Sequence, residues 1–214
     1  TAVLFGAGAG AVVIEESKSE SDGEIYSFSN GLSSDNLEIL EIPNFGSAMD
    51  RFKTDEAARV RWTFDGQEIF KSGVRAMAQA SAEAIEKSGL SKDDVDIFIP
   101  HQANIRIVEA LEKKLGLPNA TTIKKVHRYG NTSAASIPTA FVDALEEGEI
   151  KGGEIAVFTA VGAGLAWGAC AVRLGDRVTP INKSDAKLPD FDGTATDTIK
   201  RAIEYQVPDK LDKI

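Results

Sequence analysis

A histidine stands where a mostly apolar stretch of the chain ends. Residues 95–99 (VDIFI) are followed directly by Pro100 and His101, and a helix-like pattern begins soon afterwards. A buried strand that delivers a polar residue at its carboxyl end, before a helix, is a frequent position for a catalytic group in α/β proteins. The same histidine could equally serve only to satisfy hydrogen bonds at the strand end. This stretch alone favours neither interpretation.

Two further strand-like stretches also end in residues that could take part in chemistry. Asn131 follows the β-branched stretch at 121–126 and precedes an expected helix, although an isolated asparagine there is more often a cap or turn residue. The turn Gly162–Gly164 follows the apolar stretch 154–160, and it could offer a backbone N–H to a ligand oxygen or be only a hairpin. Because strands and helices alternate along the chain, these positions could converge at one edge of one sheet.

The pairing of a histidine with an asparagine suits one class of chemistry. A neutral imidazole and an amide both donate hydrogen bonds without adding net charge, so together they can stabilise a developing enolate or oxyanion. This chemistry is what carbanion formation on a thioester requires.

Composition excludes several broad classes of protein. A chain of 214 residues with 43% hydrophobic and 27% charged residues is typical of a soluble globular protein with one large domain or two small ones. The net charge of −9 argues against general nucleic-acid binding, and no apolar run reaches the length of a membrane span. The single cysteine, Cys170, excludes an internal disulfide and fits a reducing cytosol. Because the chain begins at Thr1 without methionine, we expect a fragment or a processed product.

Hydrophobic periodicity predicts an alternating α/β arrangement. Lys71 and Arg75 lie four apart on the exposed side of the clearest helix, and a solvated face is the simplest explanation for them. Residues 17–60 resemble a connection, with a short strand near 25–28. The expected helices cover 66–89, 103–115 and a stretch after 133, and the expected strands cover 95–99 (after a cap and turn at 91–94), 121–126, 154–160 and 165–174.

The glycine-rich start of the chain, 1–16, predicts a strand, a turn and a second strand. Gly6, Gly8 and Gly10 alternate with alanines, which allows another backbone to pack closely there. A dinucleotide-binding loop would need a helix to open after the glycines, whereas the β-like run 11–14 follows them. We therefore expect no dinucleotide site.

Four motifs carry a family resemblance. PHQANIRI at 100–107 and GNTSAASIP at 130–138 resemble paired signatures of the β-ketoacyl-acyl-carrier-protein synthase III family, in the thiolase superfamily. VGAGLAWGACAVRL at 161–174 resembles that family's C-terminal signature, and LFGAGAGAVVIE at 4–15 resembles its mid-chain glycine loop. The motifs occur in the family's order with near-family spacing, and this combination is far more specific than any of them alone.

The resemblance implies roles for particular residues. His101 and Asn131 match the pair that stabilises the enolate formed when a malonyl thioester loses carbon dioxide, and the N–H of Ala163 matches part of the oxyanion hole. Other residues match the family's carrier-protein docking surface (Arg106, Lys71, Lys113 and Lys114) and the surroundings of its pantetheine tunnel (Phe70, Asn104 and Ile107).

The resemblance also implies a reaction, the decarboxylative Claisen condensation of acyl-CoA with malonyl-acyl-carrier protein that initiates fatty-acid biosynthesis. It implies a cytoplasmic homodimeric acyltransferase with no metal or other cofactor. Its partners would be coenzyme A thioesters and an acidic carrier protein, which a basic patch on an acidic enzyme could attract. The alternatives are a sister thiolase-fold enzyme of secondary metabolism and a non-catalytic lobe that only binds carrier protein.

Two departures from the family limit this interpretation. Ala7 stands where the family's glycine loop usually has an acidic residue, and the nucleophilic cysteine of the family lies upstream of the position of Thr1. Cys170 lies inside a strand pattern and is not that nucleophile. We therefore expect a thiolase-like layered α/β fold that is inactive alone, because the N-terminal half is missing. Its expected parts are the last strands of the N-terminal lobe (1–16), a connecting insertion (17–60), the C-terminal lobe (61–174) and an extension (175–214), wrapped on the surface or partly disordered.

Overall fold

The computed structural model describes residues 4–35, 37–41 and 63–178, together with 193, 194, 196, 197 and 200. The chain divides into two compact units, Thr1–Ile181 and Asn182–Ile214. All helices and strands named below belong to the first unit. Much of the predicted connection at 17–60 and of the extension at 175–214 lies outside the described residues, and the predicted domain boundaries stay predictions.

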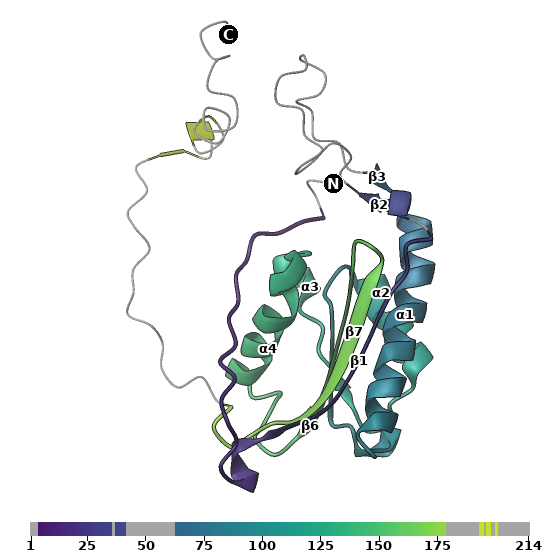
Figure 1. The fold of residues 1–214 in the computed structure, drawn as a ribbon. Helices are drawn as coiled ribbons and strands as arrows, with labels where there is room; N and C mark the ends of the chain where they lie inside the picture. Colours follow the sequence, from purple (N-terminus) through teal and green to yellow (C-terminus); the bar gives the residue numbers. More distant parts are fainter. Residues whose placement is uncertain are drawn as a thin grey trace, which may run out of the picture. The chain divides into compact units, whose positions relative to one another are not determined.

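A five-stranded mixed sheet forms the centre of the first unit (Figure 1), in the order β1-β7-β6-β4-β5. Strand β4 is parallel to β5 and to β6, whereas β7 runs antiparallel to β6 and to β1. The strands are β1 (Glu24–Leu32), β4 (Ile97–Pro100), β5 (Thr121–Thr122), β6 (Ile155–Gly162) and β7 (Ala166–Arg173). A separate two-stranded sheet pairs β2 (Leu40–Glu41) with β3 (Thr63–Phe64).

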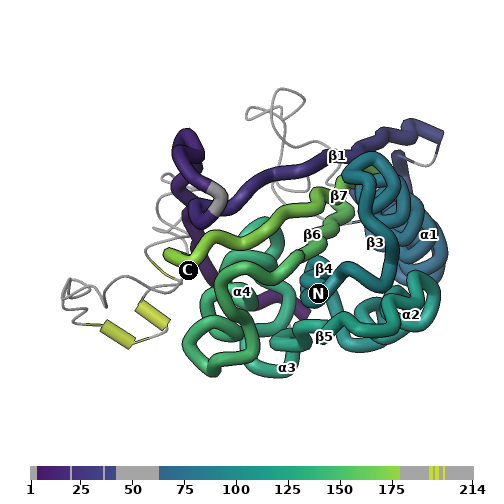
Figure 2. The backbone as a smooth tube through the Cα atoms, turned by 90° about the horizontal axis from the view of Figure 1, so that it is seen from below, coloured from purple at the N-terminus to yellow at the C-terminus, as the bar shows by residue number. Residues whose placement is uncertain are grey.

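Helices cover both faces of the central sheet (Figure 2). Helices α1 (Gly66–Lys87) and α2 (Ile105–Leu115) pack on one face, and α4 (Ser136–Glu146) packs on the other beside the short helix α3 (Val126–Tyr129). Short 3-10 turns complete the described elements: η1 (Glu20–Asp22), η2 (Leu37–Ile39), η4 (Lys92–Asp94) and η5 (Ser133–Ala135).

Strand β4 is buried on both sides, which explains its continuous apolar sequence. Phe98 packs with the side chains of α1 and α2, while Ile97 and Ile99 pack with those of α4. All residues of β4 are buried. The residue that follows β4 is therefore held at the end of the best-packed strand of the sheet.

The predicted α/β class, a mixed sheet covered by helices, is confirmed. The helices expected over 66–89 and 103–115 are present as α1 and α2, close to their predicted ends. Strand β5 is shorter than predicted because the chain turns into α3 at Val126. The short strand expected near 25–28 is instead β1, a full edge strand of the central sheet rather than part of a connection.

The glycine-rich start does not form the expected pair of strands. Phe5 makes one isolated parallel bridge to Asn131, and residues 6–18 have no regular secondary structure. Val12, Val13 and Ile14 are largely exposed, so no neighbouring strand within the described residues offers them a pairing edge. The glycine–alanine alternation that suggested a strand does reflect close packing, but the segment packs against a loop and a helix instead of a second strand.

Candidate functional site

His101 lies at the carboxyl end of β4, where it is partly buried. Its backbone N–H donates to the carbonyl of Thr159 at 2.7 Å, which continues the ladder between β4 and β6 one residue beyond Pro100. Since β4, β5 and β6 are parallel, their carboxyl ends lie at the same edge of the sheet. The segments that follow these strands carry His101, Asn131 and the Gly162–Gly164 turn.

The residue after the histidine, Gln102, links the strand ends at this edge by hydrogen bonds. The Gln102 side chain is 2% exposed, and its Nε2 donates to the carbonyls of Pro100 (2.7 Å) and Ile123 (3.1 Å). Its Oε1 accepts from the backbone N–H groups of Lys125 (2.9 Å) and Val126 (3.2 Å). One buried amide therefore ties the turn after β4 to the chain after β5, with every hydrogen-bonding position used.

The two ring nitrogens of His101 have different surroundings. Nδ1 lies 2.6 Å from Oγ of Ser136, in the first turn of α4. Nε2 has no hydrogen-bond partner within the described part of the chain. Burial lowers the pKa of His101 below its ordinary value, so the imidazole is neutral at pH 7. The ring can therefore present a neutral Nε2 to a bound molecule.

Asn131 is held through its backbone and through its side chain. Its N–H donates to the carbonyl of Leu4 at 2.9 Å, and its own carbonyl accepts from the N–H of Gly6 at 3.0 Å. Its Oδ1 accepts from the N–H of Ser133 at 2.8 Å. Because the oxygen is engaged, the amide nitrogen is the donor that Asn131 can offer outward, and it has no partner among the described residues.

Close packing by the glycine-rich segment explains its alternating pattern. A Cβ placed on Gly6 would collide with the carbonyl oxygen of Tyr129, and one placed on Gly10 would collide with the Pro138 ring. At Gly8 it would lie 3.1 Å from the Thr132 side chain. Glycine is required because this extended chain runs directly along the loop that carries Asn131 and along the start of α4. No helix opens after the glycines, since residues 6–18 have no regular secondary structure, and the segment instead packs along the site.

The third predicted site element is the turn between β6 and β7. Ala163 is exposed in this turn, and Gly164 has a φ of 147°, in the region that favours glycine. The carbonyl of Leu165 accepts from the N–H of Ser33 at 2.8 Å, which ties the turn to the chain after β1. The turn is thus a fixed hairpin at the edge of the sheet that carries His101, and its role as an oxyanion hole stays a prediction.

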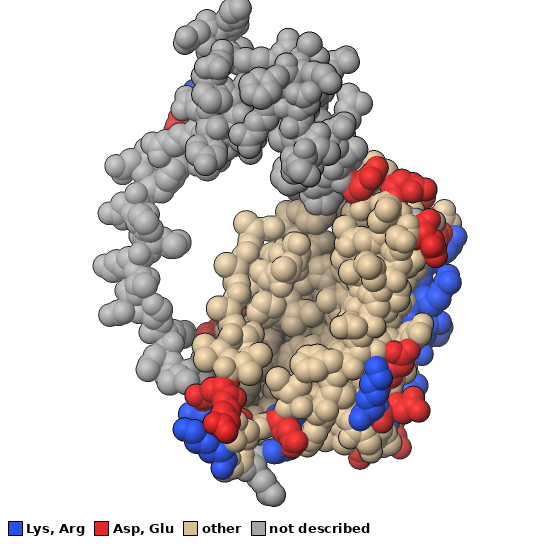
Figure 3. Space-filling view, in the orientation of Figure 1, with Lys and Arg blue, Asp and Glu red and all other residues tan. Residues whose placement is uncertain are grey.

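The residues predicted to dock a carrier protein are exposed on the α1–α2 side of the sheet. Lysine and arginine side chains lie along the α1 side in Figure 3, intermixed with carboxylates. Lys71, on α1, has a side chain that is 55% exposed and lies 3.9 Å from Glu68. The other predicted docking residues, Arg106, Lys113 and Lys114, are exposed on α2, which packs against α1.

The residues predicted near a pantetheine tunnel have structural contacts of their own. The Asn104 side chain caps α2 by accepting from the N–H of Ile107 at 3.0 Å. Ile107 is 5% exposed and belongs to the core between α1, α2 and the sheet, with Phe70 packed against the same core. Their contact with a ligand stays a prediction.

The single cysteine has the surroundings of a structural residue. Cys170 is half-buried in β7, and burial raises the pKa of its thiol above the ordinary value, which makes the thiolate scarce at neutral pH. Among the described residues, no group of three or more metal-ligating side chains comes together. None of the helices in this part of the chain is long and apolar enough to cross a membrane.

Comparison with known proteins agrees with this geometry. Residues 85–174 match the family described as 3-oxoacyl-[acyl-carrier-protein (ACP)] synthase III C terminal. The chain is 47% identical, over 207 residues, to β-ketoacyl-[acyl-carrier-protein] synthase III 2 of Vibrio cholerae, covering 96% of the chain and 56% of the relative. It is 46% identical to β-ketoacyl-[acyl-carrier-protein] synthase III of Bacillus pumilus, covering 82% of the chain and 51% of the relative. Together these matches support a synthase III-type chain with a thiolase-like fold.

Solved structures of synthase III proteins show the same fold. The Aquifex aeolicus 3-oxoacyl-[acyl-carrier-protein] synthase III superposes with a TM-score of 0.61 at 35% identity, covering 73% of this chain and 46% of that one. The priming β-ketosynthase of the R1128 polyketide pathway gives 0.66 at 31% identity, covering 71% and 45%. The fold is thus thiolase-like, as predicted, and the chain spans about half the length of the curated relatives it matches.

Sequence reasoning missed two residues that organise the site. Ser136 lies inside the GNTSAASIP motif, but nothing in the sequence indicates that its hydroxyl reaches a histidine far earlier in the chain. Gln102 lies beside His101 in PHQANIRI, yet its four hydrogen bonds become visible only once β4 and β5 are paired. A polar residue inside an otherwise apolar strand end was the available signal for Gln102.

Proposed function

We propose that this chain supplies the enolate-stabilising half of a decarboxylating condensing enzyme that acts on acyl-CoA and malonyl-acyl-carrier protein. The observation that carries the proposal is that His101 and Asn131 follow parallel strands whose carboxyl ends lie at the same edge of the sheet. Each side chain has one polar atom fixed by the protein, and each has a nitrogen with no partner among the described residues. Two neutral donors of this kind suit an enolate oxygen better than charged ones, because they leave the departing carboxylate unpaired.

In the proposed reaction the two donors act on a malonyl thioester. The bond between the malonyl Cα and its carboxylate carbon breaks, carbon dioxide leaves, and the electron pair passes into the thioester as an enolate. Nε2 of His101 and the amide nitrogen of Asn131 donate to the enolate oxygen. The nucleophilic carbon then attacks an acyl-cysteine carbonyl and expels the cysteine thiolate. The donors stabilise the charge that develops and take no proton themselves.

The acyl-cysteine must come from outside this chain. Cys170 is half-buried in a sheet strand with a raised pKa, so it is a poor nucleophile. The relatives are about twice as long as the matched region, and the family resemblance assigns the nucleophile to their first half. The chain alone is therefore proposed to be inactive in condensation. Intact-mass measurement after incubation with acyl-CoA should show no acyl adduct, and stoichiometric acylation of Cys170 would contradict this.

The central experiment is malonyl decarboxylation by the full-length synthase that contains this sequence. His101→Ala and Asn131→Ala should each lower the rate by at least about a hundredfold, because each removes one hydrogen bond made to developing charge. His127→Ala provides the matched control, since His127 is exposed on α3. A decarboxylation rate that is unchanged in His101→Ala would remove this residue from the reaction.

A second candidate function is priming of a polyketide pathway by the same chemistry. The likeness to the R1128 priming β-ketosynthase favours this candidate specifically. The two functions differ in the acyl group that the enzyme accepts. Measuring kcat/KM of the full-length protein for short acyl-CoA substrates and for the acyl-CoA substrates of secondary metabolism therefore separates them.

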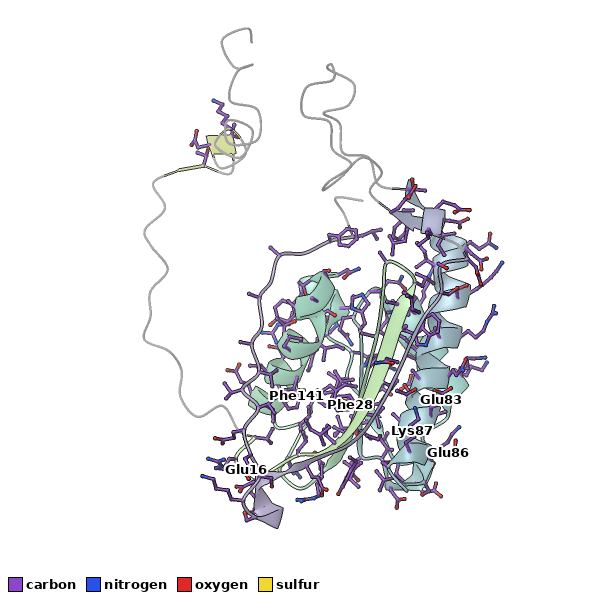
Figure 4. All side chains as sticks on the ribbon, in the orientation of Figure 1. Glu16, Phe28, Glu83, Glu86, Lys87 and Phe141 are labelled. Carbon is purple, nitrogen blue, oxygen red and sulfur yellow. The ribbon has the colours of Figure 1, made fainter. Side chains whose placement is uncertain are left out.

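Carrier-protein docking is proposed for the basic side chains of α1 and α2. Reversing charge at Arg106 and Lys113 should weaken binding of an acidic carrier protein, with an effect that shrinks as salt increases. Lys87→Glu is the matched control, because Lys87 lies among carboxylates near the end of α1, with Glu83 and Glu86 (Figure 4). Equal binding by the Arg106→Glu and Lys87→Glu variants would exclude this surface.

A further inference from the structure

The contact between His101 and Ser136 determines where the imidazole proton lies. Ser136 Oγ is 2.6 Å from His101 Nδ1 and 3.2 Å from the backbone nitrogen of Gln102. The serine is 2% exposed, so solvent does not replace either partner. It lies in the first turn of α4, on the side of the helix that meets the end of β4.

The hydroxyl of Ser136 has one proton to donate and must donate it to an available acceptor. The Gln102 N–H is a donor only, so the hydroxyl oxygen accepts from it. Thr132, one turn earlier, is also buried, and its Oγ1 has no hydrogen-bond partner among the described residues, Ser136 included, so it does not compete for the serine proton. The remaining partner of Ser136 within the described residues is Nδ1 of His101. If Nδ1 carried a proton too, the buried hydroxyl proton would have no acceptor, which is unfavourable.

We propose that Ser136 is a positioning residue that holds His101 as the neutral tautomer with its proton on Nε2. In this arrangement the Gln102 N–H donates to Ser136, Ser136 donates to Nδ1, and Nε2–H points away from the helix. This inference rests on the proposed function for its catalytic meaning, because only the Nε2–H tautomer can donate to an enolate oxygen. The tautomer itself is a property of the folded chain and can be measured without any substrate.

The chain of donors runs in one direction because it begins at a backbone amide. An N–H of the main chain cannot accept, so the polarity of the whole relay is fixed by the fold. Ser136 thus does for His101 what the Ser133 N–H does for Asn131, since each occupies one polar atom of the side chain and leaves a nitrogen as outward donor.

The deciding experiment is nitrogen NMR of the 214-residue chain labelled in its histidine rings. Long-range proton–nitrogen spectra distinguish a protonated ring nitrogen from an unprotonated one, and His127→Gln assigns the signals of the two histidines. We expect Nε2 of His101 to be protonated and Nδ1 to be unprotonated at neutral pH. A wild-type spectrum with the proton on Nδ1 would overturn the proposal by itself.

Variants of Ser136 extend the test beyond the wild-type state. Ser136→Ala removes the donor, so the His101 signals should shift towards a mixture of tautomers, while Ser136→Thr keeps the hydroxyl and should restore the wild-type pattern. Thr139→Val is the matched control, because it also removes a hydroxyl from the start of α4, but one that bonds only to carbonyls of its own helix and the residue before it. An unchanged tautomer in Ser136→Ala, in a chain that still gives dispersed spectra, would contradict the proposal.

Kinetics of the full-length synthase separate this inference from the proposed function. Ser136→Ala should lower kcat for malonyl decarboxylation by about tenfold to a hundredfold with little change in KM, because a wrong tautomer removes stabilisation of the transition state alone. Ser136→Thr should recover most of that loss. If wild type decarboxylates and Ser136→Ala does so equally fast, the positioning role is refuted while the function stands. If wild type does not decarboxylate at all but shows the Nε2–H tautomer, the function fails and the tautomer assignment stands.

Discussion

At the scale of single residues, His101 combines burial with neutrality, and this makes stability depend on pH. The folded-state pKa of His101 is lowered by burial from an ordinary value of 6.5, so the unfolded chain binds a proton more readily. The resulting stabilisation is fully present above pH 6.5 and is lost as the pH falls through the lower folded-state pKa. Urea unfolding above and below pH 6.5 should therefore show that the free energy of unfolding falls more steeply with decreasing pH for wild type than for His101→Gln. A constant difference between the two proteins across this range would contradict the prediction.

Ser133 is a residue whose backbone conformation matters more than its side chain. Its φ of 55° lies in the left-handed region, and its exposed side chain makes no packing contribution that a substitution would remove. Ser133→Val should lower the free energy of unfolding by about 2 kcal/mol, because a β-branched residue is strained there. Ser133→Gly should stay within about 1 kcal/mol of wild type, since glycine adopts this φ freely. Equal stability of the two variants in urea unfolding would show that the turn relaxes.

The residue types of the candidate site could be predicted from the sequence, but which of their atoms donate and which accept could not. The donor roles of His101 and Asn131 are predicted from their residue types and from their positions after strands. Which nitrogen of His101 is free depends on a serine hydroxyl that comes near it only when α4 packs on β4. Side-chain hydrogen bonds between distant positions leave no periodic trace in a sequence, which is why Ser136 was missed.

At the scale of elements, α3 and α4 are clamped together by charged side chains. Asp143 on α4 accepts from Tyr129 Oη and from Arg128 Nη1, both at 2.8 Å, and it is 7% exposed. Asp143→Ala should lower the free energy of unfolding by about 1–3 kcal/mol, because it leaves the partly buried Tyr129 hydroxyl without its acceptor, while Arg128 keeps its bond to Glu147. The matched control, Glu146→Ala, removes an exposed carboxylate from the same helix and should change stability little. Urea unfolding that gives equal losses for both variants would refute the clamp.

Lys125 strengthens the same junction from the side of β5. Burial lowers the pKa of its amine, but the hydrogen bonds and charges of Glu147 and Glu149 outweigh burial, and the net pKa is raised. The amine therefore stays protonated, and the chain between β5 and α3 is anchored to the end of α4. This anchoring positions the loop that carries Asn131.

At the start of helix α2, Asn104 allows a helix-capping role to be distinguished from a contact with a ligand. Asn104→Ala should lower the free energy of unfolding by about 1 kcal/mol, because the N–H of Ile107 loses its acceptor. Asn104→Asp keeps an acceptor and should preserve stability. If the Asn104→Asp variant also preserves KM for acyl-CoA in the full-length synthase, the role of this position is capping. A raised KM with normal stability would instead support the predicted contact with pantetheine.

At the scale of the whole chain, the order of elements was more predictable than the partners of the first segment. Apolar periodicity identified α1, α2 and the buried strands, because each of them buries a continuous face. The same patterns could not show that β1 lies beside β7, or that the glycine-rich segment runs along Asn131. Both contacts join parts of the chain that are far apart in sequence, and alternation alone does not specify which neighbour a strand will take.

One face of the chain remains uncovered within the described residues. Register places Phe28, Cys170 and Phe158 side by side across β1, β7 and β6, and the Phe158 ring packs edge-on against Phe141 of α4 with centroids 5.5 Å apart. Phe28 is 62% exposed, on a face that Figure 3 shows almost free of charge. A face that is almost free of charge and has an exposed aromatic side chain is typical of an interface.

We expect this face to be covered by the N-terminal lobe of a full-length synthase, so the reactivity of Cys170 should report its presence. A thiol reagent should label Cys170 faster in the 214-residue chain than in the full-length protein with its other cysteines replaced by alanine. The matched control is Glu86→Cys in a Cys170→Ala background, because Glu86 is exposed on α1, on the opposite side of the sheet (Figure 4). Its labelling should be equally fast in both proteins. Equal labelling of Cys170 in the 214-residue chain and in the full-length protein would place the N-terminal lobe elsewhere. The face that carries Phe28 would then need another partner.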